Sequence, residues 1–586
     1  MLNRRSLLIG LCLGVVCLAA YLANSRLYPA AGDVMSTRLI PFALLGWGTL
    51  TLEPFRDEFM AQGPLDWFVQ DRGGSLVSLF PVGAAVVALP VYIPCYLWLR
   101  AHGHDSPLYL FKASPVAEKL AASAIASLCV AVLFLLLCRR LSARTAAAVA
   151  LAFGLGTSMW TISSQNLWQH GPGVLCLLLG MLALELPRSG STLVAAGLFL
   201  GMAVAVRPQN GLFLAAAAAY LWVRGESRGH SMRAVLRLAL GSLLPLAAMT
   251  AYNLRYYHIL LGGYGGLYGQ ELFTRFIRPT RLLQGFSGLL LSPNRGLLMF
   301  SPVVVLGCWG MARALRRWRS EPLLAAFSGA ALAYALLHAS FTTWWGGWCF
   351  GPRFLTETLP VLAVASSLVV PSLSAWGRAA ALLLAAWSIL IQLVGAVCYP
   401  ASSWDARMMP RTKMEAEMWD YRHLEVLEDF QTWLAQRAHR LPPRAMPLPD
   451  SACRVEWKGL EWGVAEMVTR TLQPTERLAS AVTFRNVGDR VWPDAAATDA
   501  ARSGVNAVRL TYRWRRGRSW VGPYEGRADL REPLPPGQAT TVQIVIVAPA
   551  EEGIYELQFD LIQEGFSAFA ERGAQTFVVP VRVSRS

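Results

Sequence analysis

The fold class is decided by the run Glu118-Lys-Leu-Ala-Ala-Ser-Ala-Ile-Ala-Ser-Leu-Cys-Val-Ala-Val-Leu-Phe-Leu-Leu-Leu-Cys138 and by the two arginines that follow it, Arg139 and Arg140. About 20 mostly apolar residues are enough for a helix to cross the hydrocarbon core of a bilayer. Basic residues beside such a run mark its cytoplasmic end. Because this pattern recurs up to about residue 400, the sequence predicts an α-helical polytopic membrane protein.

Apolar runs of this kind predict about 11 transmembrane helices. Several of the runs are short, so tilted or broken helices would have to accommodate them. Their approximate limits are 6–24, 118–138, 145–162, 171–187, 191–206, 209–223, 235–252, 297–312, 322–341, 355–371 and 379–398.

Composition separates a membrane part from a soluble part. The 586 residues are 54% hydrophobic and 15% charged, with a mean hydropathy of +0.38, whereas soluble domains carry about a quarter charged residues. The deficit of charge lies before residue 400. The net charge of +16 comes mainly from arginines at the ends of apolar runs, so nucleic acid is not predicted as a partner. The cysteines from Cys12 to Cys398 lie in or beside apolar runs, and Cys453 alone follows them, so no disulfide or metal spacing is indicated.

The distribution of arginines predicts the topology. Arg4 and Arg5 place the N-terminus in the cytoplasm, and residues 6–23 are interpreted as a retained first helix because no convincing cleavage site follows them. An odd number of spans then places everything after residue 400 outside a bacterial inner (plasma) membrane, in the periplasm or the extracellular space. The clusters that fall on the cytoplasmic side are Arg139, Arg140 and Arg144; Arg188; Arg224 and Arg228; Arg313, Arg316, Arg317 and Arg319; and Arg378.

Residues 76–99 are long and apolar enough to span, but a span there would move every later arginine cluster to the outside. Pro81, Pro90 and Pro94 also interrupt helical hydrogen bonding. We therefore predict an interfacial or re-entrant segment within a first external loop, residues 25–117, that holds interfacial helices.

The chain changes character after residue 400. Residues 401–451 mix aromatic, Met and charged side chains, which predicts an external amphipathic linker that lies on the membrane surface. From residue 452 apolar residues alternate with polar ones, as in Val508-Arg-Leu-Thr-Tyr-Arg-Trp and Thr541-Val-Gln-Ile-Val-Ile-Val. Residues 452–586 are therefore expected to form an external, all-β Ig-like sandwich.

Several blocks before residue 400 resemble those of one known group. Together they look like the polytopic GT-C glycosyltransferases, the superfamily of the protein O-mannosyltransferases and the lipid A aminoarabinose transferase. The resemblance covers residues 1–400 and implies that they form a GT-C-like catalytic domain. The blocks are Gly32-Asp33, Ser78-Leu-Phe-Pro-Val-Gly, Gly201-Met-Ala-Val-Ala-Val-Arg-Pro, Leu291-Ser-Pro-Asn-Arg-Gly-Leu-Leu-Met-Phe-Ser-Pro and Trp344-Trp-Gly-Gly-Trp-Cys-Phe-Gly-Pro-Arg.

The resemblance implies a polyprenyl-phosphate sugar donor, a glycan, lipid or protein acceptor reached from outside, and an acidic general base in the first external loop. Asp33 is at the family's position for that base, although Val34 stands where the family often has a second acid. The alternative is that Asp33 caps the helix that follows it. Glu53, Asp57 and Glu58 are reserve acids in the same loop, or else part of a solvated or interfacial face.

Cationic groups must stabilise the charge on a leaving lipid phosphate, and arginine can bind phosphate through two hydrogen bonds. Arg207, Arg295 and Arg353, each at an external helix end, are the candidates. The alternative for each is snorkelling, or pairing with a loop carboxylate.

Sugar or acceptor contacts are expected from Gln169 and His170, and from Trp344 and Trp345 by stacking. The alternatives are polar residues at a helix end and an interfacial aromatic belt. Some members of the superfamily use a divalent metal, so the resemblance allows one here, although no ligand set in this sequence requires it.

Two other classes of function compete with glycosyl transfer. A multi-span transporter often contains an internal repeat of helices, and none is found in the sequence. An outward-facing polysaccharide polymerase or ligase would place its essential residues in a later, arginine-rich loop rather than at Asp33.

Overall fold

The structure, a computed structural model, divides into a helical unit whose described residues run to Phe430 and a β unit that begins at Gln431. The described residues are 4–24, 32–60, 68–187, 189–225, 227–263, 277–347, 349–399, 414–437, 448–462, 470–494, 507–517, 519–530, 532–564 and 566–585.

The helical unit confirms the prediction of a polytopic α-helical protein. Within the described residues, seven helical segments are long and apolar enough to cross a membrane. They are α1 (Arg4–Leu22), α4 (Gly83–Ala101), α5 (Pro107–Leu137), α10 (Arg228–Tyr257), α15 (Pro322–Ala339), the composite segment Arg353–Ser372 and α17 (Ala375–Cys398). Shorter apolar helices add α2 (Gly32–Trp47), α6 (Ala143–Leu155), α7 (His170–Glu185) and α8 (Gly190–Val206), and α9 covers Gly211–Arg224.

Two of the predicted spans are broken helices. The run 297–312 becomes α13 (Leu297–Phe300), the 3-10 turn η7 (Pro302–Val304) and α14 (Val305–Arg316). The run 355–371 begins as the 3-10 helix η8 (Arg353–Thr358) and continues as α16 (Leu359–Ala365). Proline at 302 and 360 removes a backbone donor, and irregular backbone at membrane depth is tolerated only where protein or water covers it. These breaks therefore lie where neighbouring helices bury them.

Small residues let α8 approach α10 closely. A Cβ added at Gly197 would lie 1.9 Å from the carbonyl oxygen of Leu238, and one at Gly201 would lie 2.8 Å from Ser242. Glycines four residues apart on one helix face allow such backbone contact between membrane helices. The contact fixes the end of α8, from which Arg207 projects.

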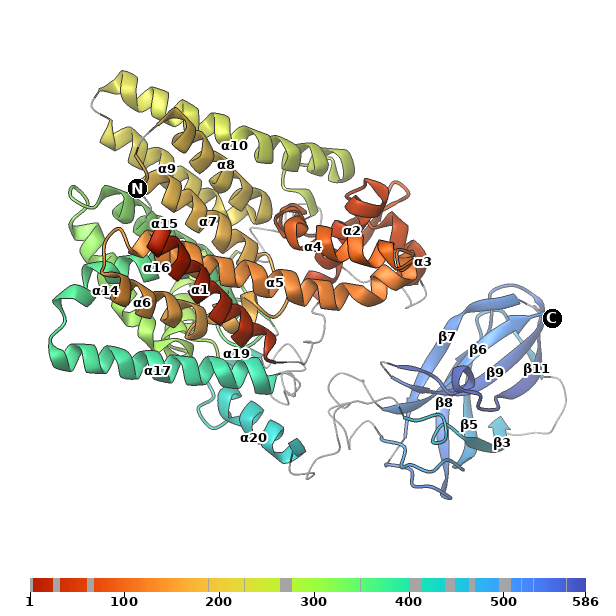
Figure 1. Ribbon diagram of the computed structural model, residues 1–586. Helices are drawn as coiled ribbons and strands as arrows, with labels where there is room; N and C mark the ends of the chain where they lie inside the picture. The colour runs from red at the N-terminus through yellow and green to blue at the C-terminus, as the bar shows by residue number, and fades with distance from the viewer. Residues whose placement is uncertain are drawn as a thin grey trace. The chain divides into compact units, whose positions relative to one another are not determined.

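The first loop, which was predicted to be external, is built around the beginning of α5. The helices α2, α3 (Arg56–Met60) and α4 all pack against α5, as Figure 1 shows. Because α5 has 31 residues, it is about 46 Å long, which exceeds the roughly 30 Å hydrocarbon core. The loop also contains the short 3-10 helix η1 (Glu53–Phe55) and a hairpin of β1 (Val69–Arg72) and β2 (Ser75–Ser78).

The prolines of α4 do not break it, although they were expected from the sequence to interrupt helical hydrogen bonding. The helix continues through Pro90 and Pro94 from Gly83 to Ala101. A proline inside a helix removes one hydrogen bond but can be accommodated by a kink, with neighbouring groups satisfying the released carbonyl. That α4 does not cross the membrane stays a prediction.

The expected linker is divided between the two units. Residues 414–430, which include α19 (Met414–Glu417) and the first half of α20 (Glu425–Arg437), belong to the helical unit. Residues 401–413 and 438–447 lie outside the described residues.

The β unit is the expected Ig-like sandwich. One sheet has the strand order β3-β5-β8 and the other has β4-β11-β9-β6-β7, with β10 beside β9. Tyr555 donates to the carbonyl of Glu551 at 2.9 Å, at the start of β9, and Trp514 is buried on β6. Both features are typical of Ig domains. The strands are β3 (Val455–Trp462), β4 (Arg470–Leu472), β5 (Arg477–Asn486), β6 (Val508–Arg516), β7 (Ser519–Asp529), β8 (Ala539–Val547), β9 (Gly553–Gln563), β10 (Ser567–Ala568) and β11 (Phe577–Val583).

We expect a fragment of residues 448–586 to fold alone and to lose stability as the pH rises from 4 to 7. Burial raises the pKa of Asp560 to about 6 although Tyr524 donates to it, whereas an unfolded Asp titrates near about 3.9. The folded state therefore holds a proton that the unfolded state releases between these values. Stability contributed by that proton is complete below pH 4 and is lost through pH 6, at up to about 1.4 kcal/mol per pH unit.

Urea unfolding of the fragment at several pH values measures this slope. Asp560→Asn should flatten it, whereas Asp529→Asn, at a half-exposed carboxylate, should leave it in place. An equal slope in wild type and Asp560→Asn, or an unfolded fragment, would contradict the prediction.

Candidate active site

Four helix ends meet inside the helical unit and form a buried cluster of His170, Arg207, His338 and Glu357. His170 begins α7, Arg207 follows α8, His338 lies in the last turn of α15, and Glu357 belongs to η8. Arg207 Nη1 lies 3.1 Å from Glu357 Oε1, and His170 Nδ1 lies 2.9 Å from Glu357 Oε2. All four side chains are buried, Glu357 completely. Charged groups at such depth require partners, and here the arginine and the carboxylate are each other's.

The hydrogen bonds of His338 define its tautomer. Its Nδ1 lies 2.9 Å from the carbonyl oxygen of Tyr334, so Nδ1 carries the proton that is donated there. Its Nε2 lies 3.0 Å from Arg207 Nη2, and since the guanidinium is only a donor, Nε2 must accept. A neutral His338 thus accepts a hydrogen bond from Nη2 of Arg207.

Arg353 and Arg207 lie on the same aromatic side chain. The Cζ atoms of Arg353 and Arg207 are 5.5 Å and 5.6 Å from the centre of the Phe354 ring. Arg353 also stacks on Trp168, with Cζ 4.3 Å from the ring centre. Two of the three predicted phosphate ligands are therefore neighbours, beside His170 and Gln169 at the start of α7.

A double-glycine turn supports Arg353. Gly346 and Gly347 have φ of 84° and 76°, which side chains rarely adopt. A Cβ at Gly346 would lie 3.1 Å from Arg353 Cγ. The turn therefore curls against the stem of Arg353, which explains why glycine stands at both positions of the Trp-Trp-Gly-Gly block.

The beginning of α2 lies beside the same groups. Val34 is completely buried in a small apolar cluster with Ile162, Trp168 and Cys349. Asp33 directly precedes Val34 in α2, and its side chain lies outside the described part of the structure. Trp168 thus shares an apolar cluster with Val34, the residue after the predicted base, and also stacks on Arg353, a predicted phosphate ligand.

A buried ion pair fixes α2 in this place. Arg38 on α2 lies 3.6 Å from Glu118 on α5, and the two side chains are 6% and 2% exposed. Glu118 also accepts from the backbone N–H of Leu167 at 2.9 Å. One carboxylate thus joins α2 to the loop that carries Trp168.

The other predicted residues lie in separate groups. Arg295 forms a fully buried ion pair with Glu425, at 2.5 Å. The indole N–H of Trp344 donates to Glu415 at 3.0 Å, and Trp345 packs edge-on against Trp344. Whether these three residues bind donor or acceptor stays a prediction.

The reserve acids belong to the outer part of the first loop. Glu53 pairs with Arg56, which also bonds Asp71, and the bond from Arg56 lowers the pKa of Glu53. Asp57 is exposed and Glu58 is half-buried. The structure describes none of these acids within the cluster around Glu357.

Three residues of the site escaped the sequence analysis although a signal for two of them was present. His338 and Glu357 are ionisable residues inside runs that were predicted to span, which marks functional candidates by default. Trp168 had no such signal, because its role depends on long-range packing. Among the described residues, no group of three His, Cys, Asp or Glu side chains is placed to hold a metal ion.

No family model and no curated protein matches the sequence. Among solved structures, the chain is similar to ArnT from Cupriavidus metallidurans bound to undecaprenyl phosphate, at 15% identity and a TM-score of 0.41, over 75% of this chain and 81% of that one. It is also similar to the oligosaccharyltransferase AglB from Archaeoglobus fulgidus in complex with an inhibitory peptide and a dolichol-phosphate, at 13% identity and a TM-score of 0.40. That match covers 74% of this chain and 63% of AglB, less than two thirds of its length. Because the likeness is distant, the proposal that follows is built on residues of this chain.

Proposed function

We propose that the protein is a membrane glycosyltransferase that moves a sugar from a polyprenyl-phosphate donor to an acceptor hydroxyl on the outer face of the membrane. The proposal is supported above all by one observation: Trp168 shares a small buried cluster with Val34, the residue after Asp33, and its ring centre lies 4.3 Å from the Cζ atom of Arg353. The start of α2, which carries Asp33, and the cation of Arg353 are thus both associated with one side chain.

The two groups suit the two halves of a glycosyl transfer. Asp33 would accept the proton of the acceptor hydroxyl, whose oxygen bonds to the anomeric carbon of the sugar. The bond from that carbon to the phosphate oxygen breaks, and the lipid phosphate leaves with its electron pair. Arg353 would stabilise the charge that develops on that phosphate.

Arg353 is the best placed of the three arginines for this role. Arg207 and Arg295 already lie against internal carboxylates, at 3.1 Å and 2.5 Å, so phosphate would have to compete with a buried ion pair. The guanidinium of Arg353 lies on the rings of Trp168 and Phe354, and Trp168 shares a buried cluster with Val34 at the start of α2. We assign the phosphate contact to Arg353 and a supporting role to the other two.

Arg353→Ala should weaken binding of undecaprenyl phosphate by about 10- to 100-fold. Loss of a charge-assisted hydrogen bond costs about 1.5–3 kcal/mol, and each 1.4 kcal/mol is tenfold in Kd. Titration of the purified protein in detergent, followed by tryptophan fluorescence, measures the change.

Arg319→Ala is the matched control, because Arg319 lies 4.6 Å from the ring of Trp318 but is exposed. It should bind the lipid as the wild type does. An unchanged Kd for Arg353→Ala would show that the phosphate lies elsewhere.

The outer-face orientation has a test of its own. The arginine clusters place the C-terminus outside, so alkaline phosphatase fused after residue 586 should be active in intact cells. A fusion at the loop of Arg313–Arg319 should be inactive. The opposite pattern would reverse the topology and put the proposed site in the cytoplasm.

A further inference from the structure

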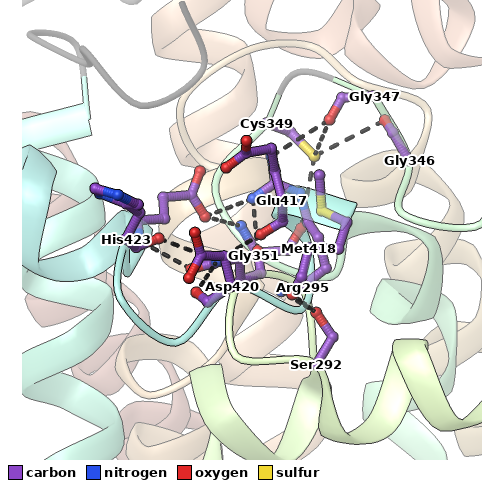
Figure 2. A network of polar contacts seen from close by, with 12 residues as sticks. Ser292, Arg295, Gly346, Gly347, Cys349, Gly351, Glu417, Met418, Asp420 and His423 are labelled. Carbon is purple, nitrogen blue, oxygen red and sulfur yellow. Dashed lines mark hydrogen bonds and ion pairs between the residues drawn. The ribbon is translucent and has the colours of Figure 1, made fainter. Parts of the chain in front are cut away.

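Residues 414–430, which follow the long helix α17 in sequence, belong to the helical unit and contact the chain just before Arg353. We call residues 414–430 the strap. Asn294 donates to the carbonyls of Glu417, Asp420 and His423 at 2.9, 3.1 and 3.1 Å, and Ser292 donates to that of Met418 at 2.6 Å. Figure 2 shows these bonds converging on one loop. The two N–H groups of one amide are thus shared among three carbonyls spaced three residues apart, which ties residues 417–423 of the strap to Asn294.

The strap contains a buried carboxylate, that of Glu425. Glu425 and Arg295 are both completely buried, 2.5 Å apart. The same Glu425 oxygen accepts from the backbone N–H of Gly351 at 3.4 Å, and Arg295 donates to the carbonyl of Gly347 at 3.4 Å. The ion pair therefore touches the 347–351 turn at both of its ends.

That turn leads directly into Arg353. The Arg353 N–H donates to the carbonyl of Gly351 at 3.1 Å, and Gly351 has φ of 75° against the ring of Phe300. Because Gly351 is bonded to Glu425, and Gly347 to the Arg295 that pairs with Glu425, a displacement of Glu425 would pass to Gly351 and so to Arg353. A shift of the turn would displace the Arg353 guanidinium from Trp168.

We infer that Glu425 is a positioning residue for the donor phosphate, acting through Gly351 and Arg295 on Arg353. The inference rests on the proposed function, since it concerns the same phosphate contact. By this inference the strap contributes to the phosphate site, although its residues follow the apolar helices in sequence.

A double-mutant cycle on the full-length protein tests the inference, with undecaprenyl phosphate as the probe. Glu425→Gln should weaken binding about tenfold in the wild-type background and should have no further effect in Arg353→Ala, because residues that act through one another are not additive. Glu417→Gln, which removes a charge from the strap but not its backbone bond to Asn294, should bind as the wild type does.

If Glu425→Gln does not fold, Glu425→Asp keeps the charge beside Arg295 and shortens its reach to Gly351; it should show a smaller loss with the same dependence on Arg353. Wild-type binding by the Glu425 variant, or an equal loss in both backgrounds, would overturn the inference alone. Wild-type binding by Arg353→Ala would overturn the proposed function and the inference with it.

Discussion

Asp33→Asn is expected to reduce the rate of sugar transfer by about 10²- to 10⁴-fold, the range that a positioned general base supplies. Asparagine keeps the size of the side chain and most of its hydrogen bonding but cannot take the proton of the acceptor hydroxyl. Binding of undecaprenyl phosphate should be unchanged, because that contact is assigned to Arg353. Single-turnover transfer from a polyprenyl-phosphate-linked sugar, measured by release of the lipid phosphate, separates the two effects.

The matched control is Asp57→Asn, at an exposed acid of the same loop. It should transfer at the wild-type rate. If Asp57→Asn is inactive and Asp33→Asn is active, the base lies in the outer part of the loop, and the assignment of Asp33 is wrong. If Asp33 serves only the first turn of α2, in which it lies, its replacement by asparagine should leave the transfer rate unchanged and should cost at most about 1 kcal/mol of stability.

Glu357→Ala should destabilise the helical unit by about 3–5 kcal/mol, because it leaves Arg207 buried without its carboxylate. His170 and His338 cannot replace the lost negative charge, because they contact Arg207 only through imidazole ring nitrogens and an imidazole is not an anion. Because membrane proteins often unfold irreversibly, the measurement is the fraction that stays monodisperse after heating. Replacing both partners, in Arg207→Met with Glu357→Leu, should recover part of the loss.

The control for this prediction is Glu185→Ala. Glu185 also pairs with an arginine, Arg140, at 2.7 Å, but its side chain is 20% exposed. Partly exposed pairs contribute about 1 kcal/mol or less. Equal heat resistance of Glu357→Ala and wild type would contradict a buried ion pair at the site.

The apolar runs predicted the helical unit because length and hydropathy alone decide which segments can lie in a bilayer. They did not predict how polar residues inside the runs pair. Lys119, in the run that decides the fold, donates to Gln165 at 2.5 Å, and its neighbour Glu118 bonds Arg38. The partners are far apart in sequence, so no local pattern contains them. Asp33 and Arg353 came from the family resemblance, whereas Glu357 came only from the structure.

Local signals were also present and missed in the first loop. Gly73-Gly74, with φ of 60° and 82°, joins β1 to β2, and two glycines between short strands are a strong hairpin signal. Pro90 and Pro94 lie inside one continuous helix, α4, which packs on α2 and α5, so these prolines alone do not decide whether the segment crosses the membrane. In the β unit the alternation of apolar and polar residues was enough to predict the strands, because each strand buries one face within the unit.

The most direct test is a density map of the full-length protein with undecaprenyl phosphate. The phosphate is predicted within hydrogen-bond distance of the Arg353 guanidinium, beside the cluster that Trp168 shares with Val34 at the start of α2. A phosphate bound instead at Arg56 in the outer part of the first loop, or against the β unit, would contradict the account.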